Sequence, residues 1–232
     1  MKRLSVIIPV YNEEKTIETV INRTLSLSLP GIDKEIIVLD DGSKDQSPAI
    51  IKRFGGRIRS YFGEQNKGKG FAIRQGFKMS KGDFVIIQDA DLEYDPSDFS
   101  GLLQPLLDGH ADVVYGSRFI SDRPHRVLFF WHSLGNKFLT ALSNMFTNLN
   151  LTDMEVGYKA FNRVAIDKIK DELKSDRFTI EPEITARVAR YHLRVYEVGI
   201  SYRGRTYEEG KKINWKDGVA ALFAIIRYRF FK

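Results

Sequence analysis

The sequence predicts an α/β protein with a mostly parallel central sheet and helices on both faces of that sheet. Short, continuous runs of apolar and β-branched residues alternate with longer segments in which apolar residues recur at helical spacing. The runs are apolar throughout, which is typical of strands buried between two helical layers. Polar and acidic clusters directly follow several runs, and such sheets bind ligands at the carboxyl ends of their strands. We therefore expect a ligand site along one edge of the sheet.

The first half of the chain alternates regularly between the two patterns. Apolar residues from Ile17 to Leu25 recur at helical spacing, and Pro30 and Gly31 end that helix. The run at 84–88 has the strongest strand pattern and leads directly into an acidic cluster. Strands are predicted at 4–11, 35–39, 58–62, 84–88 and 112–116, and helices at 14–29, 48–54 and 69–79.

The second half is less regular but keeps the same alternation. An apolar stripe predicts a helix at 127–149, whose other face is mostly Asn, Ser and Thr. Asn214 is placed to cap a final helix. Further strands are predicted at 158–161 and 195–202, and helices at 181–191 and 215–230. No repeat or Pro/Gly/Ser linker interrupts the chain, so we expect residues 1–232 to form one domain.

Composition narrows the class of protein. The chain has 232 residues, of which 43% are hydrophobic, so it can bury the core of one domain. It has no cysteine, which excludes disulfides, thiolate zinc sites and thiol catalysis and fits a reducing cytoplasm. The longest charge-free stretch, 138–152, is too short and too polar for a transmembrane helix, which needs about 20 apolar residues. The apolar run near the amino end is too short for a secretory signal.

Charge is distributed unevenly along the chain. Residues 1–116 carry 15 Lys and Arg against 17 Asp and Glu, a net charge of −2, and residues 117–232 carry 21 against 13, a net charge of +8. A basic half suggests an anionic partner, which could be a nucleic acid, an acidic membrane or a phosphorylated substrate. A solvated basic surface explains the charge equally well. No nucleic-acid recognition motif accompanies it, so a nucleic-acid partner is not expected.

An acidic cluster follows the strongest predicted strand. Asp89, Asp91 and Glu93 place three carboxylates within five residues, and their mutual repulsion is relieved by a bound cation. Oxygen ligands favour Mg²⁺ or Mn²⁺, ions that commonly bridge to substrate phosphates. A solvated loop is the alternative for an isolated Asp-x-Asp motif. The nearby Asp40 and Asp41, at the end of another buried strand, favour the metal site.

A glycine-rich segment, 66–70, opens the predicted helix at 69–79. Its glycines allow close approach of the backbone to a ligand, and the amino end of a helix attracts phosphate. The spacing does not match a P-loop, which disfavours ATPase chemistry of that type. A glycine-rich turn without a ligand is the alternative interpretation.

Taken together and in order, these motifs carry a resemblance to a known family. They are Val6-Ile7-Ile8-Pro9-Val10-Tyr11-Asn12-Glu13-Glu14, Val38-Leu39-Asp40-Asp41-Gly42-Ser43, Asn66-Lys67-Gly68-Lys69-Gly70, Asp89-Ala90-Asp91-Leu92-Glu93, Gly116-Ser117-Arg118, the segment 152–161 and the segment 202–212. The chain resembles the family-2 inverting glycosyltransferases with a GT-A fold, and within them the polyprenyl-phosphate hexose synthases. The resemblance covers nearly the whole chain.

This resemblance implies a fold and an activity. Residues 1–116 would form a Rossmann-like half that binds the nucleotide sugar and a Mg²⁺ or Mn²⁺ ion, and residues 117–232 the acceptor half. The enzyme would transfer a hexose, mannose from GDP-mannose or glucose from UDP-glucose, to dolichyl or another polyprenyl phosphate. The anomeric centre would be inverted, giving a β-linked product. A glycosyltransferase that acts on a glycan or another hydroxyl acceptor is the alternative enzyme, and a catalytically silent binding subunit is the alternative outside enzymes.

Residue roles follow from the same resemblance. Asp89, Asp91 and Glu93 would hold the metal, although some relatives have glutamine where this chain has Glu93. The expected catalytic residues are Asp91, Arg118, Arg205 and Lys211, the last two neutralising the leaving diphosphate from a loop that can close. Arg118 and Arg126 would bind the acceptor phosphate. The nucleotide sugar would be bound by Pro9, Tyr11, Glu13, Val38, Asp40, Asp41, Lys69, Asp89 and Ala90.

The nature of the acceptor decides whether a base is needed. A polyprenyl monophosphate is already anionic and can attack without one, whereas a hydroxyl acceptor needs a general base. Asp153 and Glu155 are the base candidates in that case. The structural alternative is that Asp153 caps a turn and Glu155 pairs with a basic residue.

Two apolar segments are candidates for contact with a membrane. Phe129, Phe130 and Trp131 lie close to Arg123 and Arg126, and the helix at 215–230 combines an apolar stripe with basic residues. Aromatic and basic residues together suit an interfacial position on an anionic bilayer. Many relatives continue into transmembrane helices. We expect a peripheral enzyme on the cytosolic membrane face, attached directly or through a membrane-embedded partner, with burial of both segments against the sheet as the alternative.

Overall fold

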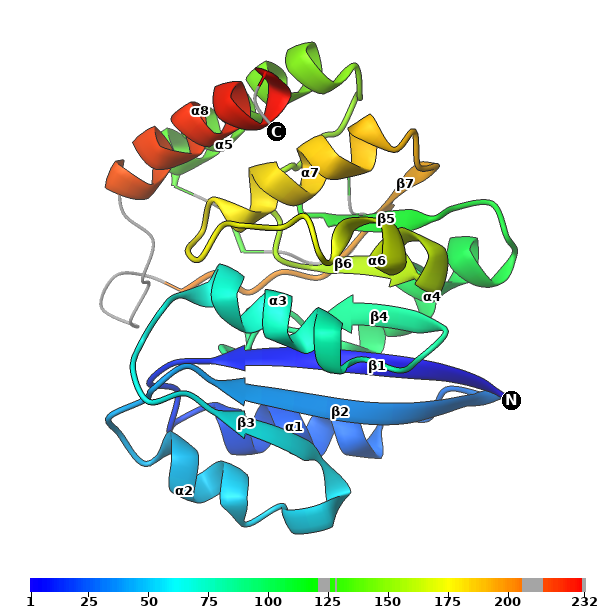
Figure 1. The fold of residues 1–232 in the computed structure, drawn as a ribbon, viewed down its shortest axis with the longest axis vertical. Coiled ribbons are helices and arrows are strands. Elements are labelled where there is room, and N and C mark those ends of the chain that lie inside the picture. Colours follow the sequence, from blue (N-terminus) through cyan, green and yellow to red (C-terminus); the bar gives the residue numbers. More distant parts are fainter. Residues whose placement is uncertain (121–125, 128, 206–214, 231–232) are drawn as a thin grey trace.

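The computed structural model describes residues 1–120, 126–127, 129–205 and 215–230. Over these residues the chain forms one mixed sheet flanked by helices (Figure 1). The strands are β1 (Lys2–Val10), β2 (Ile32–Asp40), β3 (Arg59–Phe62), β4 (Phe84–Ile87), β5 (Val113–Ser117), β6 (Lys159–Asn162) and β7 (Val195–Gly199). The helices are α1 (Ile17–Ser26), α2 (Ser47–Lys52), α3 (Lys69–Met79), α4 (Phe99–Leu107), α5 (Phe130–Thr147), α6 (Arg163–Ile169), α7 (Ile180–Arg190) and α8 (Trp215–Phe230), with short 3-10 turns at Gly55–Arg57 and Pro96–Asp98.

The strand order explains where the site forms. The sheet runs β3-β2-β1-β4-β6-β5-β7, and all pairs are parallel except those of β6, which is antiparallel to β4 and β5. Because β6 runs in reverse, its amino end lies at the edge where β4 and β5 have their carboxyl ends. The segment before β6, residues 148–158, is therefore delivered to the same edge as the acidic cluster after β4. The predicted mostly parallel sheet is confirmed.

The core explains why the apolar runs become strands. The side chains of Val6, Ile7 and Ile8 are fully buried, as expected for a strand covered on both faces. A Cβ atom at Gly76 would lie 2.4 Å from Ile7 Cγ2, so glycine lets α3 pack directly onto β1. Burying such a side chain contributes roughly 1.5–3 kcal/mol.

Most predicted elements are present, with differences at their ends. The helix expected at 69–79 has those bounds as α3, whereas the helices expected at 14–29 and 127–149 are shorter and form α1 and α5. Helices α4 and α6 were not predicted. Pro105 and Gly101 lie inside α4 and weaken its helical pattern. Helix α6 has 7 residues, which is too short for a clear periodicity.

The last helix lies beside α5 at the end of the molecule opposite α2 (Figure 1). It packs on α5 and α7: the rings of Phe146 and Phe230 are 5.6 Å apart, and the Arg187 guanidinium of α7 lies 5.8 Å from the centre of the Tyr228 ring. Phe223 and Phe230 remain exposed to solvent. In the described part of the chain, no helix has the length and apolarity that crossing a membrane requires.

Candidate active site

A cavity of about 940 Å³ opens at the carboxyl ends of the strands. Most of the residues predicted from the sequence line it: Pro9, Tyr11, Glu13, Asp41, Lys69, Asp89, Ala90, Asp91, Glu93, Arg118 and Arg205. Val38, Asp40, Arg126 and Asp153 are not among its lining residues. Lys211 lies outside the described residues. The cavity also receives side chains from α5, α7 and α8, so both halves of the chain build it.

Asp41 organises the glycine-rich segment on the nucleotide side of the cavity. Its carboxylate accepts hydrogen bonds from the backbone N–H of Lys67, at 3.1 Å, and of Gly68, at 2.6 Å. Gly68 has φ +115°, and a Cβ there would lie 2.4 Å from the carbonyl oxygen of Asp176, so the position requires glycine. Asp40 is buried and accepts a hydrogen bond from the Ser43 N–H at 3.0 Å. Asp41 therefore shapes the loop that leads into α3.

The first acid of the predicted metal pair is held by a lysine. Lys69 Nζ lies 2.8 Å from Asp89 Oδ1 and 3.4 Å from Glu181 Oε1. Burial opposes the charge on Lys69, but the carboxylates of Asp89 and Glu181 outweigh it and raise the pKa of the lysine. A Cβ at Gly157 would lie 2.4 Å from Asp89 Oδ2, so this glycine makes room for the Asp89 carboxylate.

The second acid of the pair lies in a different environment. Burial raises the pKa of Asp91 to about 7, assisted by the charges of Asp89 and Glu93 and opposed by the Arg205 guanidinium. Arg205 Nη2 lies 3.0 Å from Asp91 Oδ2 and 3.1 Å from Glu13 Oε1. The Arg205 backbone N–H donates to Glu93 Oε1 at 2.8 Å. One guanidinium thus lies among three carboxylates.

The donor set fits a divalent ion that is shared with a phosphate. Within the described ranges, no three His, Asp or Glu side chains converge to hold an ion by themselves. Glu93, predicted as a third ligand, instead accepts hydrogen bonds from Tyr202 Oη at 2.9 Å and from Arg205. Mg²⁺ is usually bound by one or two carboxylates with substrate phosphates completing the shell. Asp89 and Asp91 suit that arrangement, and the Arg205 guanidinium already shows that positive charge is stabilised beside Asp91.

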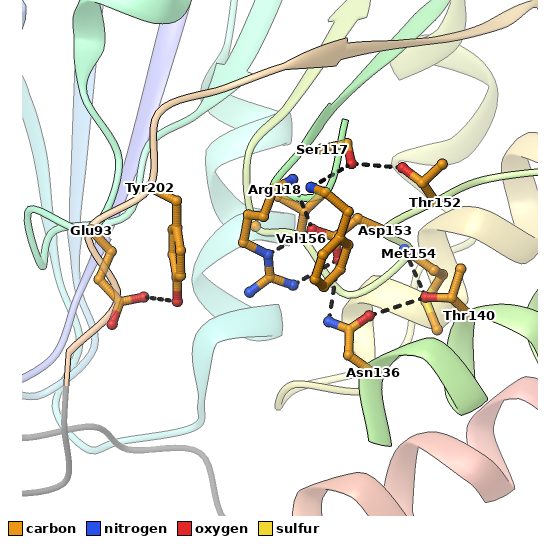
Figure 2. Close-up of polar contacts among 12 residues, drawn as sticks. Glu93, Ser117, Arg118, Asn136, Thr140, Thr152, Asp153, Met154, Val156 and Tyr202 are labelled. Carbon is orange, nitrogen blue, oxygen red and sulfur yellow. Dashed lines mark hydrogen bonds and ion pairs between the residues drawn. The ribbon is translucent and has the colours of Figure 1, made fainter. Parts of the chain in front are cut away.

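Arg118, predicted to bind phosphate, forms an ion pair with Asp153, predicted as a base candidate. Figure 2 shows Arg118 facing Asp153, with Nε 2.6 Å from Oδ2 and Nη2 2.7 Å from Oδ1. Asn136 Nδ2 donates to the same carboxylate at 3.2 Å. The Arg118 guanidinium also lies 5.2 Å from the centre of the Tyr202 ring, which contacts Glu93 on the metal side. Arg118 reaches the cavity while Asp153 stays completely buried behind it.

Two glutamates complete the cavity between these groups. Glu155 lines the cavity, and burial, together with the charge of Glu181, raises its pKa to about 7. Glu181 also lines it and pairs with the buried Lys159. The sequence indicates Glu155 only as a base candidate and does not point to Glu181. The signal for Glu181 was weak, because an acid at the start of a helix is common on protein surfaces.

Arg126 lies outside the cavity wall. Its backbone N–H donates to the Tyr202 carbonyl at 3.0 Å, and its Nη1 donates to the Gly204 carbonyl at 2.9 Å. Arg126 therefore holds the segment that precedes Arg205. In this structure its contacts fix the segment 202–204, and Arg126 is not among the cavity-lining residues.

Comparison with known proteins agrees with this geometry. The model of the family "Glycosyl transferase family 2" matches residues 5–170. Glycosyltransferase AglD of Haloferax volcanii is 30% identical over 209 residues, which are 86% of this chain and 33% of that protein, so the chain spans about a third of its length. The UDP-N-acetylglucosamine–dolichyl-phosphate N-acetylglucosaminyltransferase of Methanococcus voltae is 25% identical over 249 residues, covering 100% of this chain and 98% of that protein.

A solved structure shows the shared fold. Glucosyl-3-phosphoglycerate synthase from Mycobacterium tuberculosis, in complex with Mn²⁺, UDP and phosphoglyceric acid, superposes with a TM-score of 0.72 at 20% identity. The match covers 100% of this chain and 80% of that one. The GT-A fold predicted from the sequence is confirmed. With the family model covering most of the residues from β1 to α6, the chain belongs to glycosyl transferase family 2.

Proposed function

We propose that this enzyme transfers a hexose from a nucleotide-diphosphate sugar to a polyprenyl phosphate of the dolichyl type, with inversion. One observation carries the proposal: a single cavity joins a paired-aspartate site to Arg118, an arginine that is paired with the fully buried Asp153. The first site suits a diphosphate with its metal, and the second suits an anionic acceptor. The dolichyl-phosphate relative and the UDP-bound structural neighbour support both assignments.

The donor would occupy the side of the cavity formed by β1, β2 and β4. Pro9, Tyr11, Glu13 and Asp41 line the part that suits the nucleoside. Asp89 and Asp91 would hold a Mg²⁺ or Mn²⁺ ion, which neutralises charge on the diphosphate. The structural neighbour binds Mn²⁺ together with UDP, which supports a divalent ion here. Mannose from GDP-mannose and glucose from UDP-glucose are the two donors we propose.

The acceptor phosphate would bind at Arg118 and attack the anomeric carbon. A bond forms between a phosphate oxygen and that carbon while the bond from the carbon to the diphosphate breaks, so the nucleoside diphosphate leaves with the electron pair. The attacking phosphate is already an anion, so no side chain has to remove a proton. Arg205 and Lys211 would stabilise the charge that develops on the leaving group, which is the charge an enzyme gains most by stabilising.

The surface beside the cavity suits a lipid acceptor. At the start of α5, Phe130 and Trp131 are 69% and 77% exposed, and Trp131 also lines the cavity. Helix α8, beside α5, exposes Phe223 and Phe230 together with Arg227. Exposed aromatic and basic side chains favour the interface of an anionic bilayer. We propose a peripheral enzyme on the cytosolic face of a membrane, with a membrane-embedded partner as the alternative means of attachment.

A donor and acceptor screen tests the proposal. Purified protein is incubated with Mn²⁺ and with radiolabelled GDP-mannose, UDP-glucose or UDP-N-acetylglucosamine, each with dolichyl or undecaprenyl phosphate in detergent. We expect label in the organic phase with one donor and none when the lipid phosphate is omitted. Label that appears only in a water-soluble glycan would contradict the lipid acceptor and favour a hydroxyl acceptor.

A further inference from the structure

Glu155 is a carboxylate on the cavity wall with a buried oxygen that lacks a donor. Its side chain lines the cavity, but its Oε1 is buried and accepts no hydrogen bond from any described residue. Glu181 also lines the cavity, and its Oε1 is likewise buried without a hydrogen-bond partner within the described part of the chain, although Lys69 Nζ lies 3.4 Å away. A buried acceptor without a donor costs about 1–3 kcal/mol. Such groups are retained where a ligand supplies the missing donor.

The position of Glu155 connects the two ends of the proposed reaction. On one side, Glu181 contacts Lys69, which contacts Asp89 of the metal pair. On the other side lies Arg118: its charge, and those of Lys159 and Asp153, act on the Glu155 carboxylate. A sugar that is passed from a diphosphate at Asp89 to a phosphate at Arg118 must lie between these groups.

We infer that Glu155, together with Glu181, forms the subsite for the transferred sugar and selects a neutral, hydroxyl-bearing ring. This inference rests on the proposed function. It assigns recognition of the sugar part of the donor to Glu155 and Glu181. Sugar hydroxyls are hydrogen-bond donors, and a carboxylate accepts from them with the added strength of its charge. Glu155 contacts the sugar directly, and Glu181 is a positioning residue that acts through its ion pairs with Lys69 and Lys159 and through its charge on Glu155.

The local charge makes the subsite selective against acidic sugars. The carboxylates of Asp89 and Glu181 are balanced by the ammonium groups of Lys69 and Lys159, so the Glu155 carboxylate leaves a surplus of one negative charge at a pH above its pKa of about 7. Arg118 is matched by Asp153. A uronic acid would bring another carboxylate into this surplus of negative charge, so its donor should bind less well than the corresponding hexose donor.

The first test measures binding rather than turnover. Isothermal titration calorimetry in Mn²⁺ compares UDP with UDP-glucose and GDP with GDP-mannose for the wild-type protein and for Glu155→Gln. For whichever nucleotide binds, the ratio of the affinity for the nucleotide sugar to the affinity for the nucleoside diphosphate is the quantity compared. We expect this ratio to fall by tenfold or more in Glu155→Gln. Binding of the nucleoside diphosphate itself should change by less than twofold, because the metal pair and the nucleoside side are untouched.

A control on the same helix separates recognition from structure. Glu183, two residues after Glu181, is buried, is not among the cavity-lining residues, and accepts the backbone N–H groups of Lys174 and Ser175. Glu183→Gln should lower stability yet leave the ratio of nucleotide-sugar to nucleotide affinity unchanged. Glu181→Gln should reduce that ratio as Glu155→Gln does.

The matching uronate donor provides a second readout. Wild-type protein should bind UDP-glucuronate, or GDP-mannuronate, at least tenfold more weakly than the hexose donor, and Glu155→Gln should narrow this gap. An unchanged sugar-to-nucleotide ratio in Glu155→Gln would overturn the inference. If that variant also lost turnover, Glu155 would be a base for a hydroxyl acceptor instead. A protein that binds no nucleoside diphosphate and no nucleotide sugar in Mn²⁺ would contradict the proposed function itself.

Discussion

Arg118 and Asp153 form a two-point ion pair in which the carboxylate has no exposed surface. Nε and Nη2 of the arginine lie 2.6 and 2.7 Å from the two carboxylate oxygens, and Asn136 adds a third donor (Figure 2). Both oxygens of this carboxylate are occupied by these donors, and Asp153 is not among the cavity-lining residues. Asp153 is therefore better suited to orienting Arg118 than to removing a proton, which favours an acceptor that is already ionised.

The ion pair predicts an asymmetric loss of stability. Arg118→Ala should lower the free energy of unfolding by about 3–5 kcal/mol, because it leaves a buried carboxylate unpaired. The double variant Arg118→Ala/Asp153→Ala should recover part of this loss. Urea unfolding measures both. The pair of the exposed Arg194 with the partly buried Asp112 provides a control with similar geometry, and Arg194→Ala should have a much smaller effect. Equal losses at the two arginines would mean that burial of Asp153 does not govern stability.

The paired aspartates predict metal-dependent donor binding. Asp89→Asn and Asp91→Asn should each abolish transfer and weaken Mn²⁺ binding in the presence of the nucleoside diphosphate, because each removes an anionic ligand. Glu93→Gln should weaken Mn²⁺ binding less, since Glu93 contacts Tyr202 and Arg205 instead. Electron paramagnetic resonance of free Mn²⁺ gives the affinities. Full transfer activity in excess EDTA would rule out the metal site.

Replacing Arg205 should lower both turnover and stability, and a bound metal ion should reverse the loss of stability. Removal of a charge-assisted donor from a closed site typically costs a factor of about 10²–10³ in rate, so Arg205→Ala should mainly lower kcat. Without metal, the same change leaves Glu13, Asp91 and Glu93 without their shared cation. Thermal unfolding in EDTA should show a lower Tm for Arg205→Ala, and Mn²⁺ should restore more of it than in the wild type.

The control for this prediction lies two residues earlier. Arg203 is exposed and contributes its backbone N–H to the Glu93 carbonyl, so Arg203→Ala keeps that contact. It should match the wild type in both kcat and Tm. If Arg203→Ala and Arg205→Ala behaved alike, the effect would belong to the segment and not to the guanidinium among the carboxylates.

Local patterns in the sequence determine much of the fold and the acidic side of the site. The apolar runs in β1, β2 and β4 allow only a sheet covered on both faces, and the polar residues after each run then meet at one edge. Helix α3 has the bounds expected from the sequence, and the glycine-rich segment 66–70 opens it, with Gly68 at positive φ directly before Lys69. The position of Asp89 and Asp91 in a cavity follows from the same reasoning.

Other features depend on tertiary pairing that local patterns do not encode. A strand of 4 residues such as β6 carries no signal for its direction, yet its reversal brings Asp153 and Glu155 beside Arg118. The contact of Arg205 with Glu13 joins residues 192 positions apart. Val38 is a different case. The resemblance implies that Val38 lies at the nucleotide, whereas its side chain is fully buried in β2.

The carboxyl group of Glu155 predicts a dependence of stability on pH. Burial and Glu181 raise its pKa to about 7 in the folded chain from an ordinary 4.5, against the opposing charges of Lys159 and Arg118. The folded chain therefore holds a proton that the unfolded chain releases, and stability falls as pH rises from 4.5 to 7. Glu155→Gln should lose less stability over this window, by about 3 kcal/mol, because one pKa unit corresponds to about 1.4 kcal/mol.

Urea unfolding of both proteins at intervals from pH 5 to pH 8 in EDTA checks this. Asp91 also titrates in the window, but it is present in both proteins, so the difference between the two curves reports on Glu155. Glu155→Gln should be the more stable protein at pH 8. Parallel curves would show that the Glu155 carboxyl ionises normally in the folded chain.

The exposed aromatic residues of α5 and α8 predict binding to an anionic bilayer. Phe130 and Phe223 are 69% and 67% exposed, and Arg227 is exposed on α8. Insertion of the rings should combine with electrostatic attraction of about 1 kcal/mol per basic residue near the surface. We therefore expect co-sedimentation with vesicles that contain anionic lipid, and less with neutral vesicles or at high salt.

Variants distinguish insertion from attraction. Phe130→Ser with Phe223→Ser should reduce binding to both kinds of vesicle, whereas Arg227→Glu should reduce binding only to anionic ones. Val164, on α6, is 58% exposed, and Val164→Ser controls for loss of an apolar side chain from a different helix. The first pair leaves Trp131 and the cavity wall intact, so transfer to detergent-dispersed lipid phosphate should continue. Wild-type protein that stays in the supernatant under every condition, yet transfers sugar to lipid phosphate in detergent, would mean that α5 and α8 do not anchor the enzyme and that a membrane-embedded partner recruits it.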